Sequence, residues 1–318
     1  MMASETRTSG PARTARTRGV PPAGRGEPGA GAGAVGGAVG GGRTGAAGRS
    51  GLSGRAGLTV LAIVLSLVSI FPVLWMMTSA FKTRSTVTDG RLIPREFTVD
   101  NFVYVFTEVP FARYLWNSFL ISAVITIAAL FFHSMAAYAL ARLRFPGRET
   151  IFLAIFSTLL VTIPVVLIPL FLVARELHLL NSYAGLIIPA IFNAFGIFLL
   201  RQFYLGLPKE LEEAAIVDGC GHWRVYWNIV LPMSRPVLSA LAVFFFLANW
   251  NAFVWPLVST NDESLTVVQL GIASFQTQYS SNWNYILAAA TIAALPMLAL
   301  FFAFQRQIVE SIKTSGMK

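Results

Sequence analysis

Long apolar stretches alternate with short charged ones along most of this chain. Five intervals contain no Asp, Glu, Lys or Arg, and each is longer than the roughly 20 residues that a helix needs to cross the hydrocarbon core of a bilayer. These intervals are 56–81, 114–141, 150–174, 177–200 and 236–261. Each therefore predicts a membrane-spanning helix.

A sixth charge-free interval, 264–305, is too long for a single spanning helix. Its first half contains the polar run 277–283, so only about residues 284–304 are expected to span. The whole pattern predicts an all-α integral membrane protein with six transmembrane helices. They are expected at about 57–80, 115–140, 150–174, 184–200, 237–257 and 284–304.

Composition agrees with a membrane location. The chain is 55% hydrophobic and 12% charged, with a mean hydropathy of +0.64, which excludes an ordinary water-soluble globular protein. Residues 1–50 differ, because they are rich in Gly, Ala, Arg, Thr and Pro. Such a segment buries too little apolar surface to offset its ordering entropy, so we expect a disordered cytoplasmic tail before a membrane domain at 51–318. The first apolar stretch is too long for a signal-peptide core and is expected to be retained.

Basic residues gather on one side of the predicted spans. With the N-terminus inside, the inner segments carry Arg43, Arg49, Arg55, Arg142, Arg144, Arg148, Arg201, Lys209, Arg224, Arg235, Arg306, Lys313 and Lys318. The outer segments carry only Lys82, Arg84, Arg91, Arg95, Arg113 and Arg175. Because Lys and Arg are enriched in cytoplasmic loops, both termini are expected in the cytoplasm, together with the charged segment between the fourth and fifth spans. The arginines of the tail are expected to reinforce this topology, with contact to anionic membrane lipid as the alternative.

That charged segment, residues 201–235, has the signals of a helix, a sharp turn and a second helix. Pro208 and the acidic residues behind it suit a helix N-terminus, where a missing N–H costs nothing and carboxylates meet the positive end of the dipole. Asp218 and Gly219 are expected to end this helix, because glycine adopts the left-handed cap conformation. A second short helix is expected over 222–230, where the following proline stops it.

No cofactor, metal or nucleotide site is indicated. The single cysteine, Cys220, excludes an internal disulfide, and the three histidines are scattered. The chain has no Gly-x-x-x-x-Gly-Lys-Ser/Thr loop for nucleotide phosphates. No charged residue falls in the centre of a predicted span, where ion-coupled carriers commonly use one. His133 leaves two interpretations, a neutral histidine bonded to a neighbouring helix, which we favour, or a proton relay.

The charged segment also carries a recognisable motif. The pattern E-A-A-x-x-x-G is matched by Glu213, Ala214, Ala215 and Gly219, with Ile229, Leu231 and Pro232 downstream. Further matches lie at 117–118, 138–147, 196–203, 250–256 and 315–318. Over about residues 56–318 the chain therefore resembles the permease subunits of ATP-binding-cassette (ABC) importers of the carbohydrate branch, and specifically the second permease of a maltose-type pair.

The resemblance implies a transport subunit of a bacterial plasma membrane and not an enzyme. The implied partners are a second permease, a cytoplasmic ATPase dimer and an extracytoplasmic sugar-binding protein, without nucleic acid. Residues 208–232, called the coupling element below, would dock in a cleft of the ATPase. The residues implied in this docking are Glu213, Ala214, Ala215, Asp218, Gly219, Ile229, Leu231 and Pro232. The competing interpretation is an amphipathic surface helix that only connects two spans.

Trp250 and Asn251, in the fifth predicted span, are candidates for the substrate pathway. An aromatic plane stacks on the apolar face of a sugar ring, and an amide bonds its hydroxyls. Trp is also enriched at membrane interfaces, and Asn commonly bonds a neighbouring helix, so structural roles remain open. For the whole chain, the leading alternative function is a self-contained secondary carrier or channel. A membrane enzyme finds no nucleophile, base or metal cluster to support it.

Overall fold

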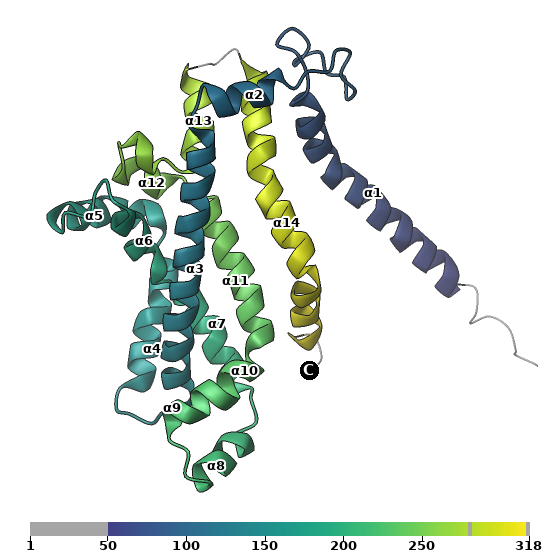
Figure 1. The fold of residues 1–318 in the computed structure, drawn as a ribbon. Helices are drawn as coiled ribbons and strands as arrows, with labels where there is room; N and C mark the ends of the chain where they lie inside the picture. The colour runs from purple at the N-terminus through teal and green to yellow at the C-terminus, as the bar shows by residue number, and fades with distance from the viewer. Residues whose placement is uncertain (1–49, 279–281, 316–318) are drawn as a thin grey trace, which may run out of the picture. The chain divides into compact units, whose positions relative to one another are not determined.

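The computed structural model describes residues 50–278 and 282–315. The tail expected at 1–50 thus lies almost wholly outside the described residues. The chain divides into two units within its first helix, Met1–Thr59 and Val60–Lys318, and the packing given below is that of the second unit. Within the described ranges the secondary structure is α-helical apart from loops, short 3₁₀ and π turns and one isolated bridge (Figure 1).

Four helical stretches are long and apolar enough to cross a membrane, and two bent helix pairs would each add one more. The four belong to α1 (Ser50–Ser79), α3 (Phe111–Arg142), α6 (Tyr183–Ile191) joined to α7 (Ala194–Leu205), and α14 (Trp283–Ser315). The bent pairs are Arg148–Leu160 with Ile163–Glu176, and His222–Met233 with Arg235–Trp250. The described chain is therefore an all-α protein with four to six candidate spans.

The third predicted span, 150–174, is not one straight helix. The structure has α4 (Arg148–Ser157) and a 3₁₀ turn, then α5 (Ile163–Glu176), with a bend of 107° between them. The backbone leaves the helical conformation at Val161 (φ −94°, ψ 116°). Pro164 then lies in the first turn of α5, where its missing N–H is tolerated. A charge-free stretch sets the length of an apolar segment but does not show where a proline restarts the helix.

The fourth and fifth predicted spans are also interrupted. α6 and α7 are separated at Asn193, whose side-chain oxygen accepts the Phe195 N–H at 2.8 Å and so caps α7. The predicted helix at 237–257 is α11 (Arg235–Trp250), followed by a short break and α12 (Val254–Ser259). These breaks place polar amides inside otherwise apolar segments.

The loop after α1 is organised around a buried cation. Lys82 has no exposed surface; its ammonium group lies 3.0 Å from the carboxylate of Asp89. Asn101, at the start of α2 (Asp100–Thr107), donates to the carbonyls of Ala80 and Lys82, both at 2.8 Å. A single antiparallel bridge joins Lys82 to Phe97. Because these contacts satisfy the buried charge and the loop carbonyls, the loop is a folded part of the molecule.

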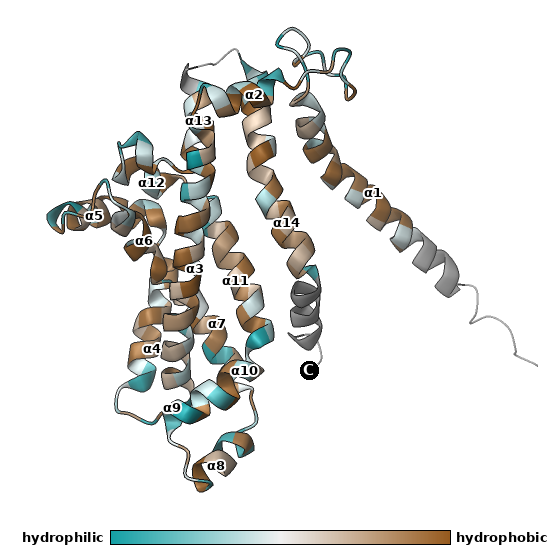
Figure 2. Ribbon diagram, in the orientation of Figure 1, coloured by the Kyte–Doolittle hydropathy of each residue, from teal (hydrophilic) through white to brown (hydrophobic). Residues whose placement is uncertain are grey.

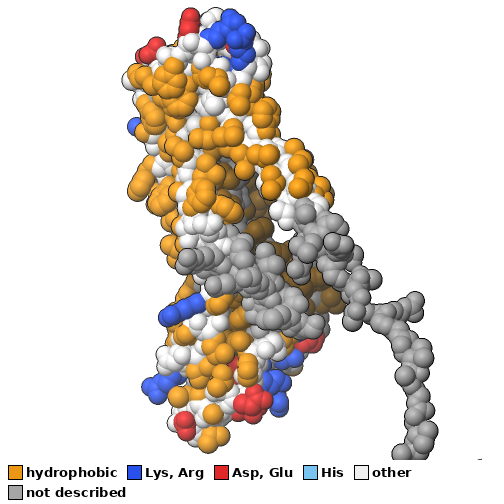
Figure 3. Space-filling model, turned by 90° about the vertical axis from the view of Figure 1, so that its right-hand side faces the viewer, with side chains coloured by type: hydrophobic (Ala, Val, Ile, Leu, Met, Phe, Trp, Pro, Cys, Tyr) orange, Lys and Arg blue, Asp and Glu red, His pale blue; other side chains and the backbone are white. Residues whose placement is uncertain are grey.

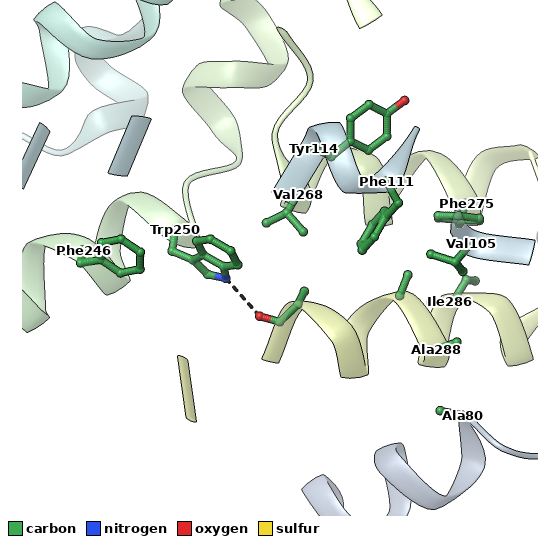
Figure 4. Packing of buried hydrophobic residues seen from close by; sticks show 12 residues of the cluster. Ala80, Val105, Phe111, Tyr114, Phe246, Trp250, Val268, Phe275, Ile286 and Ala288 are labelled. Carbon is green, nitrogen blue, oxygen red and sulfur yellow. Dashed lines mark hydrogen bonds between the residues drawn. The ribbon is translucent and has the colours of Figure 1, made fainter. Parts of the chain in front are cut away.

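Helix α3 is the centre of the packing. It lies against α6, α7, α11 and α13 (Val268–Gln278), while α14 packs on α2, α11 and α13. Figure 4 shows one apolar cluster at this junction, in which side chains of α3, α11, α13 and α14 meet. The long helices consist mainly of hydrophobic residues (Figure 2), and many of their large apolar side chains are exposed. On the face seen in Figure 3, hydrophobic side chains cover much of the described surface between the two ends, and charged ones gather toward the ends, as expected for a surface that meets lipid.

Candidate functional site

The coupling element forms two short helical runs joined by a sharp turn. α8 (Glu210–Val217) begins two residues after Pro208, with acidic residues in its first turn. Gly219 has φ +84° and follows the last turn of α8. The N–H of Gly219 donates to the Ile216 carbonyl and that of Cys220 to the Ala215 carbonyl, at 3.0 and 2.9 Å. These two bonds form a Schellman cap, so the left-handed glycine ends α8 as expected.

The second run is longer than the sequence indicates. It consists of α9 (His222–Val225), a π-helical turn (Tyr226–Val230) and α10 (Leu231–Met233). Pro232 does not stop it at Leu231, because the proline occupies the first turn of α10, where no N–H is needed. The wide π turn is closed by the Leu231 N–H, which donates to the Tyr226 carbonyl.

The outer surface of the coupling element is apolar as well as charged. Glu213, Ala214, Asp218, Gly219 and Pro232 are exposed. Three large apolar side chains of α8 are also exposed, Leu211 by 47%, Ile216 by 45% and Val217 by 86%. Ala215, Ile229 and Leu231 are half-buried and pack against the buried cluster behind the element. Five of the eight sequence-predicted residues thus lie in α8 or at the turn that ends it. The other three, Ile229, Leu231 and Pro232, lie in the π turn and in α10.

Glu212 points the other way from its neighbour Glu213 and connects α8 to the end of α3. It is 8% exposed, and its carboxylate lies 2.8 Å from Nε of Arg142 at the end of α3. The Arg142 N–H does not point along that line, so the contact is a charge pair and not a directed hydrogen bond. Arg142 also donates from Nη2 to the Leu207 carbonyl at 2.7 Å. Burial, opposed by Arg142, raises the pKa of Glu212 above the usual value.

Sequence reasoning did not single out this pair. Arg142 and Glu212 were both placed in cytoplasmic segments by the basic-residue pattern. Their opposite charges on one membrane side were the available signal. The pairing itself needs the packing of α8 under α3, which no local pattern gives.

A cavity of about 630 Å³ lies between α3, α5, α6, α11 and α12. Its walls are mainly aliphatic and aromatic, and among the described residues that line it few are polar and none is charged. The polar lining residues are Ser118, Asn193, Asn249 and Asn251, and the aromatic ones are Phe192, Phe244, Phe245, Phe253 and Trp255. This size and lining suit a small-molecule site, in which a few polar groups orient a ligand against apolar walls.

The two candidate pathway residues are adjacent in sequence but lie in different environments. Trp250 is 2% exposed, packs on Phe246 and donates its indole N–H to the Ala293 carbonyl at 3.2 Å (Figure 4). It does not line the cavity. Asn251 is exposed, lines the cavity and accepts a hydrogen bond from Gln269 at 3.0 Å. The pathway expectation for Trp250 therefore has no support in this conformation, because α11 ends there with the indole turned toward α14.

His133 makes the contact expected of a neutral histidine. It is fully buried, and its Nε2 accepts the backbone N–H of Asn193 at 3.1 Å. A nitrogen that accepts a hydrogen bond carries no proton, so this contact requires the uncharged ring. Gly196 makes room for it, since an added Cβ would collide with Nδ1 of His133. Among the described residues, no group of three or more His, Cys, Asp or Glu side chains is placed to hold a metal ion.

Solved structures with the same fold include a bacterial ABC transporter involved in the import of the acidic polysaccharide alginate. The similarity to that chain has a TM-score of 0.72 at 23% identity and covers 83% of this chain and 99% of the other. A second structure, of an alginate ABC transporter in complex with its pentasaccharide-bound periplasmic protein, gives a TM-score of 0.59 at 17% identity. It covers 80% of this chain and 96% of the other.

Sequence relatives are closer. The arabinooligosaccharides transport system permease protein AraQ of Halalkalibacterium halodurans is 34% identical, over 80% of this chain and 93% of the relative. The diacetylchitobiose uptake system permease protein NgcG of Streptomyces coelicolor is 32% identical, over 79% and 85%. Residues 134–314, more than half of the chain, match the family described as the binding-protein-dependent transport system inner membrane component. The chain therefore belongs to this family, the membrane-embedded permease subunits of ABC transporters.

Proposed function

We propose that this chain is one of two permease subunits of an ATP-driven importer of di- or oligosaccharides. The carrying observation is the coupling element, where an exposed E-A-A-x-x-x-G motif is combined with a left-handed Gly219 between two short helical runs. Relatives named for arabinooligosaccharides, diacetylchitobiose and lactose support the cargo class. ATP would be hydrolysed by a separate chain, and a loaded extracytoplasmic protein would deliver the sugar.

Docking on the ATPase would use the exposed face of α8. Leu211, Ile216 and Val217 expose apolar surface beside charged residues, a combination typical of a surface that a protein partner covers. Ala214 permits close approach, and Glu213 would pair with a basic or polar group of the ATPase. Since Glu212 is tied to Arg142 of α3, movement of the docked α8 would be passed to the membrane domain.

The membrane topology belongs to this proposal. Six spans result when each bent helix pair counts as one crossing. Both termini and the coupling element then lie in the cytoplasm, in agreement with the distribution of Lys and Arg. The domain division proposed with this topology is a cytoplasmic tail at 1–50 and a permease domain at 51–318.

The cavity would form this chain's part of the sugar pathway. Asn251 and Asn249 offer amides to sugar hydroxyls, and Phe253 offers an apolar face. Because no charged side chain lines the cavity, it suits a neutral saccharide better than a phosphorylated or uronic-acid cargo. Trp250 would act indirectly, by holding the end of α11 against α14.

Reconstitution in liposomes tests the proposal. The chain alone should neither hydrolyse ATP nor move a radiolabelled sugar that the cognate binding protein retains. Uptake should require the partner permease, the ATPase and the loaded binding protein together, and should stop when the catalytic residues of the ATPase are disabled. Uptake by the lone chain, driven by a proton or sodium gradient, would instead establish a secondary carrier.

A further inference from the structure

Three buried hydroxyl groups join the coupling element to the helices around the cavity. Ser134 of α3 lies 2.7 Å from the hydroxyl of Tyr204 in α7 and 2.8 Å from the hydroxyl of Tyr226 in the π turn. None of the three residues is more than 2% exposed. One hydroxyl has one donor hydrogen and two acceptor lone pairs, so Ser134 can bond both phenols at once. We name Ser134, Tyr204 and Tyr226 the hydroxyl cluster.

The position of this cluster links the two parts of the candidate site. Tyr226 opens the π turn that Leu231 closes within the coupling element. π turns are rare and are enriched at functional sites, because the wider turn displaces the side chains that follow. In this chain the wide turn begins at Tyr226, whose phenol bonds Ser134 of α3. The second helical run is therefore tied to α3 through a side chain, in addition to the charge pair of α8.

The other end of the link reaches the cavity. His133 precedes Ser134 in α3 and accepts a hydrogen bond from the backbone N–H of Asn193. Asn193 lines the cavity at the break between α6 and α7. Ile125, nine residues before Ser134 in the same helix, also lines it, about 13 Å away along the helix axis. Tyr204 lies in α7, which begins directly after Asn193. Two consecutive residues of α3 thus bond the coupling element and the wall of the cavity.

We infer that the hydroxyl cluster positions α3 and α7 relative to the coupling element, so that movement of the docked ATPase changes access to the cavity. The inference rests on the proposed function and assigns Ser134 and Tyr226 as positioning residues for it. Removing either hydroxyl leaves the docking surface intact, because Tyr226 and Ser134 are buried behind it. What is lost is the rigid connection between the coupling element and α3. ATP hydrolysis should therefore continue with a smaller effect on access to the cavity.

The test uses the complete importer with a reporter in the cavity. Ala252 lines the cavity and is half-buried, so Ala252→Cys in a Cys220→Ser background reacts with N-ethylmaleimide at a rate that follows access. The rate is measured with and without ATP plus vanadate. Tyr226→Phe should reduce the ATP-dependent change in labelling rate roughly two- to tenfold, which corresponds to the free energy of one buried hydrogen bond. Ser134→Ala makes the same test from α3, outside the coupling element, and should leave basal ATP hydrolysis and co-purification of the ATPase unchanged.

Tyr138→Phe is the matched control. Tyr138 belongs to the same buried cluster, and its ring centroid lies 5.2 Å from that of Tyr226. Its hydroxyl has no hydrogen-bond partner among the residues that the structure describes. Tyr138→Phe should therefore show the full ATP-dependent change in labelling rate. Ser134→Ala should lose at least as much of this change as Tyr226→Phe, because it removes the bond to Tyr204 as well as the bond to Tyr226. The double variant should lose no more than Ser134→Ala alone, because the bond to Tyr226 is already absent in that variant. Ser134→Ala also serves where Tyr226→Phe assembles poorly.

A full ATP-dependent change in Tyr226→Phe or Ser134→Ala would overturn the inference and leave the proposed function intact. The absence of any ATP-dependent change in the background protein would overturn the proposed function itself. Equal loss in Tyr138→Phe would also count against the cluster, since it would trace the effect to aromatic packing and not to the hydroxyl bonds.

Discussion

Gly219 is the residue at which the coupling element changes direction. Its φ of +84° lies in the left-handed region, which costs a residue with a Cβ more than glycine. The Schellman bonds of Gly219 and Cys220 depend on that conformation. The angle between α8 and α9 therefore rests on one residue that the motif already marked in the sequence.

Gly219→Val should cost about 1–3 kcal/mol of local strain and misalign the two helical runs. The variant should insert in the membrane but lose ATPase association and uptake. Gly221→Val is the matched control, because Gly221 has φ −73° and ψ 159° and an added Cβ there meets nothing within 4 Å. Co-purification with the ATPase and uptake in vesicles measure the effect. If the two variants associate with the ATPase and support uptake equally well, the left-handed turn is not required for coupling.

Neighbouring residues in one motif can have unrelated roles, and this limits what a sequence shows about a site. Glu213, which the sequence predicts to contact the ATPase, is exposed, whereas Glu212 next to it turns inward to Arg142. Trp250 and Asn251 divide in the same way, one into the core and one into the cavity. Residue types and spacing identified Glu213, Trp250 and Asn251 but not Glu212. Which side each one faces depends on where a helix ends and what packs against it.

Among the secondary-structure elements, the apolar segments were predictable and their breaks were not. Hydrophobic length alone located α1, α3 and α14, because lipid-facing helices must be apolar over their whole span. The 107° bend before α5 and the cap of α7 at Asn193 depend on single residues inside such segments. Proline and asparagine are tolerated in straight spanning helices too, when neighbouring groups satisfy the backbone. Their presence therefore does not by itself predict a break.

The charge pair between α8 and α3 should depend on pH. Burial raises the pKa of Glu212, so its carboxyl holds a proton more tightly in the folded protein than in the unfolded chain. Its contribution to the free energy of unfolding is then greatest below about pH 4.3, the ordinary glutamate value, and is lost as the pH rises through the folded-state pKa. Glu212→Gln cannot titrate. Relative to wild type, this variant should therefore gain stability as the pH rises from 4 to 7.

Thermal unfolding of the detergent-solubilised protein at pH 4, 5.5 and 7 measures this difference. Glu213→Gln is the control, since it makes the same substitution on an exposed side chain one position away. If the stability of wild type instead rises relative to that of Glu212→Gln as the pH increases, the attraction of Arg142 outweighs the cost of burying the carboxylate. α8 would then be held to α3 mainly by charge.

For the whole molecule, orientation follows from charge and not from the fold. An all-α bundle can be placed in a bilayer either way up, but Lys and Arg are retained on the cytoplasmic side during insertion. Residues 1–55, 142–148 and 201–235 carry most of the bases. The bases of the loop between α1 and α2 are partly offset by Asp89 and Glu96, and the buried Lys82 is paired with Asp89. The coupling element is therefore expected inside, where an ATPase can reach it.

Cysteine labelling tests that orientation at two exposed positions. In a Cys220→Ser background, Glu96→Cys in the loop after α1 should react with a membrane-impermeant thiol reagent in intact cells. Asp218→Cys, exposed at the end of α8, should react only after the membrane is permeabilised. A cysteine at Ser234 would be a poor reporter, since that residue is fully buried and would stay unlabelled from either side. Labelling of Asp218→Cys in intact cells, with protection of Glu96→Cys, would invert the topology and place the coupling element where no cytoplasmic ATPase could dock.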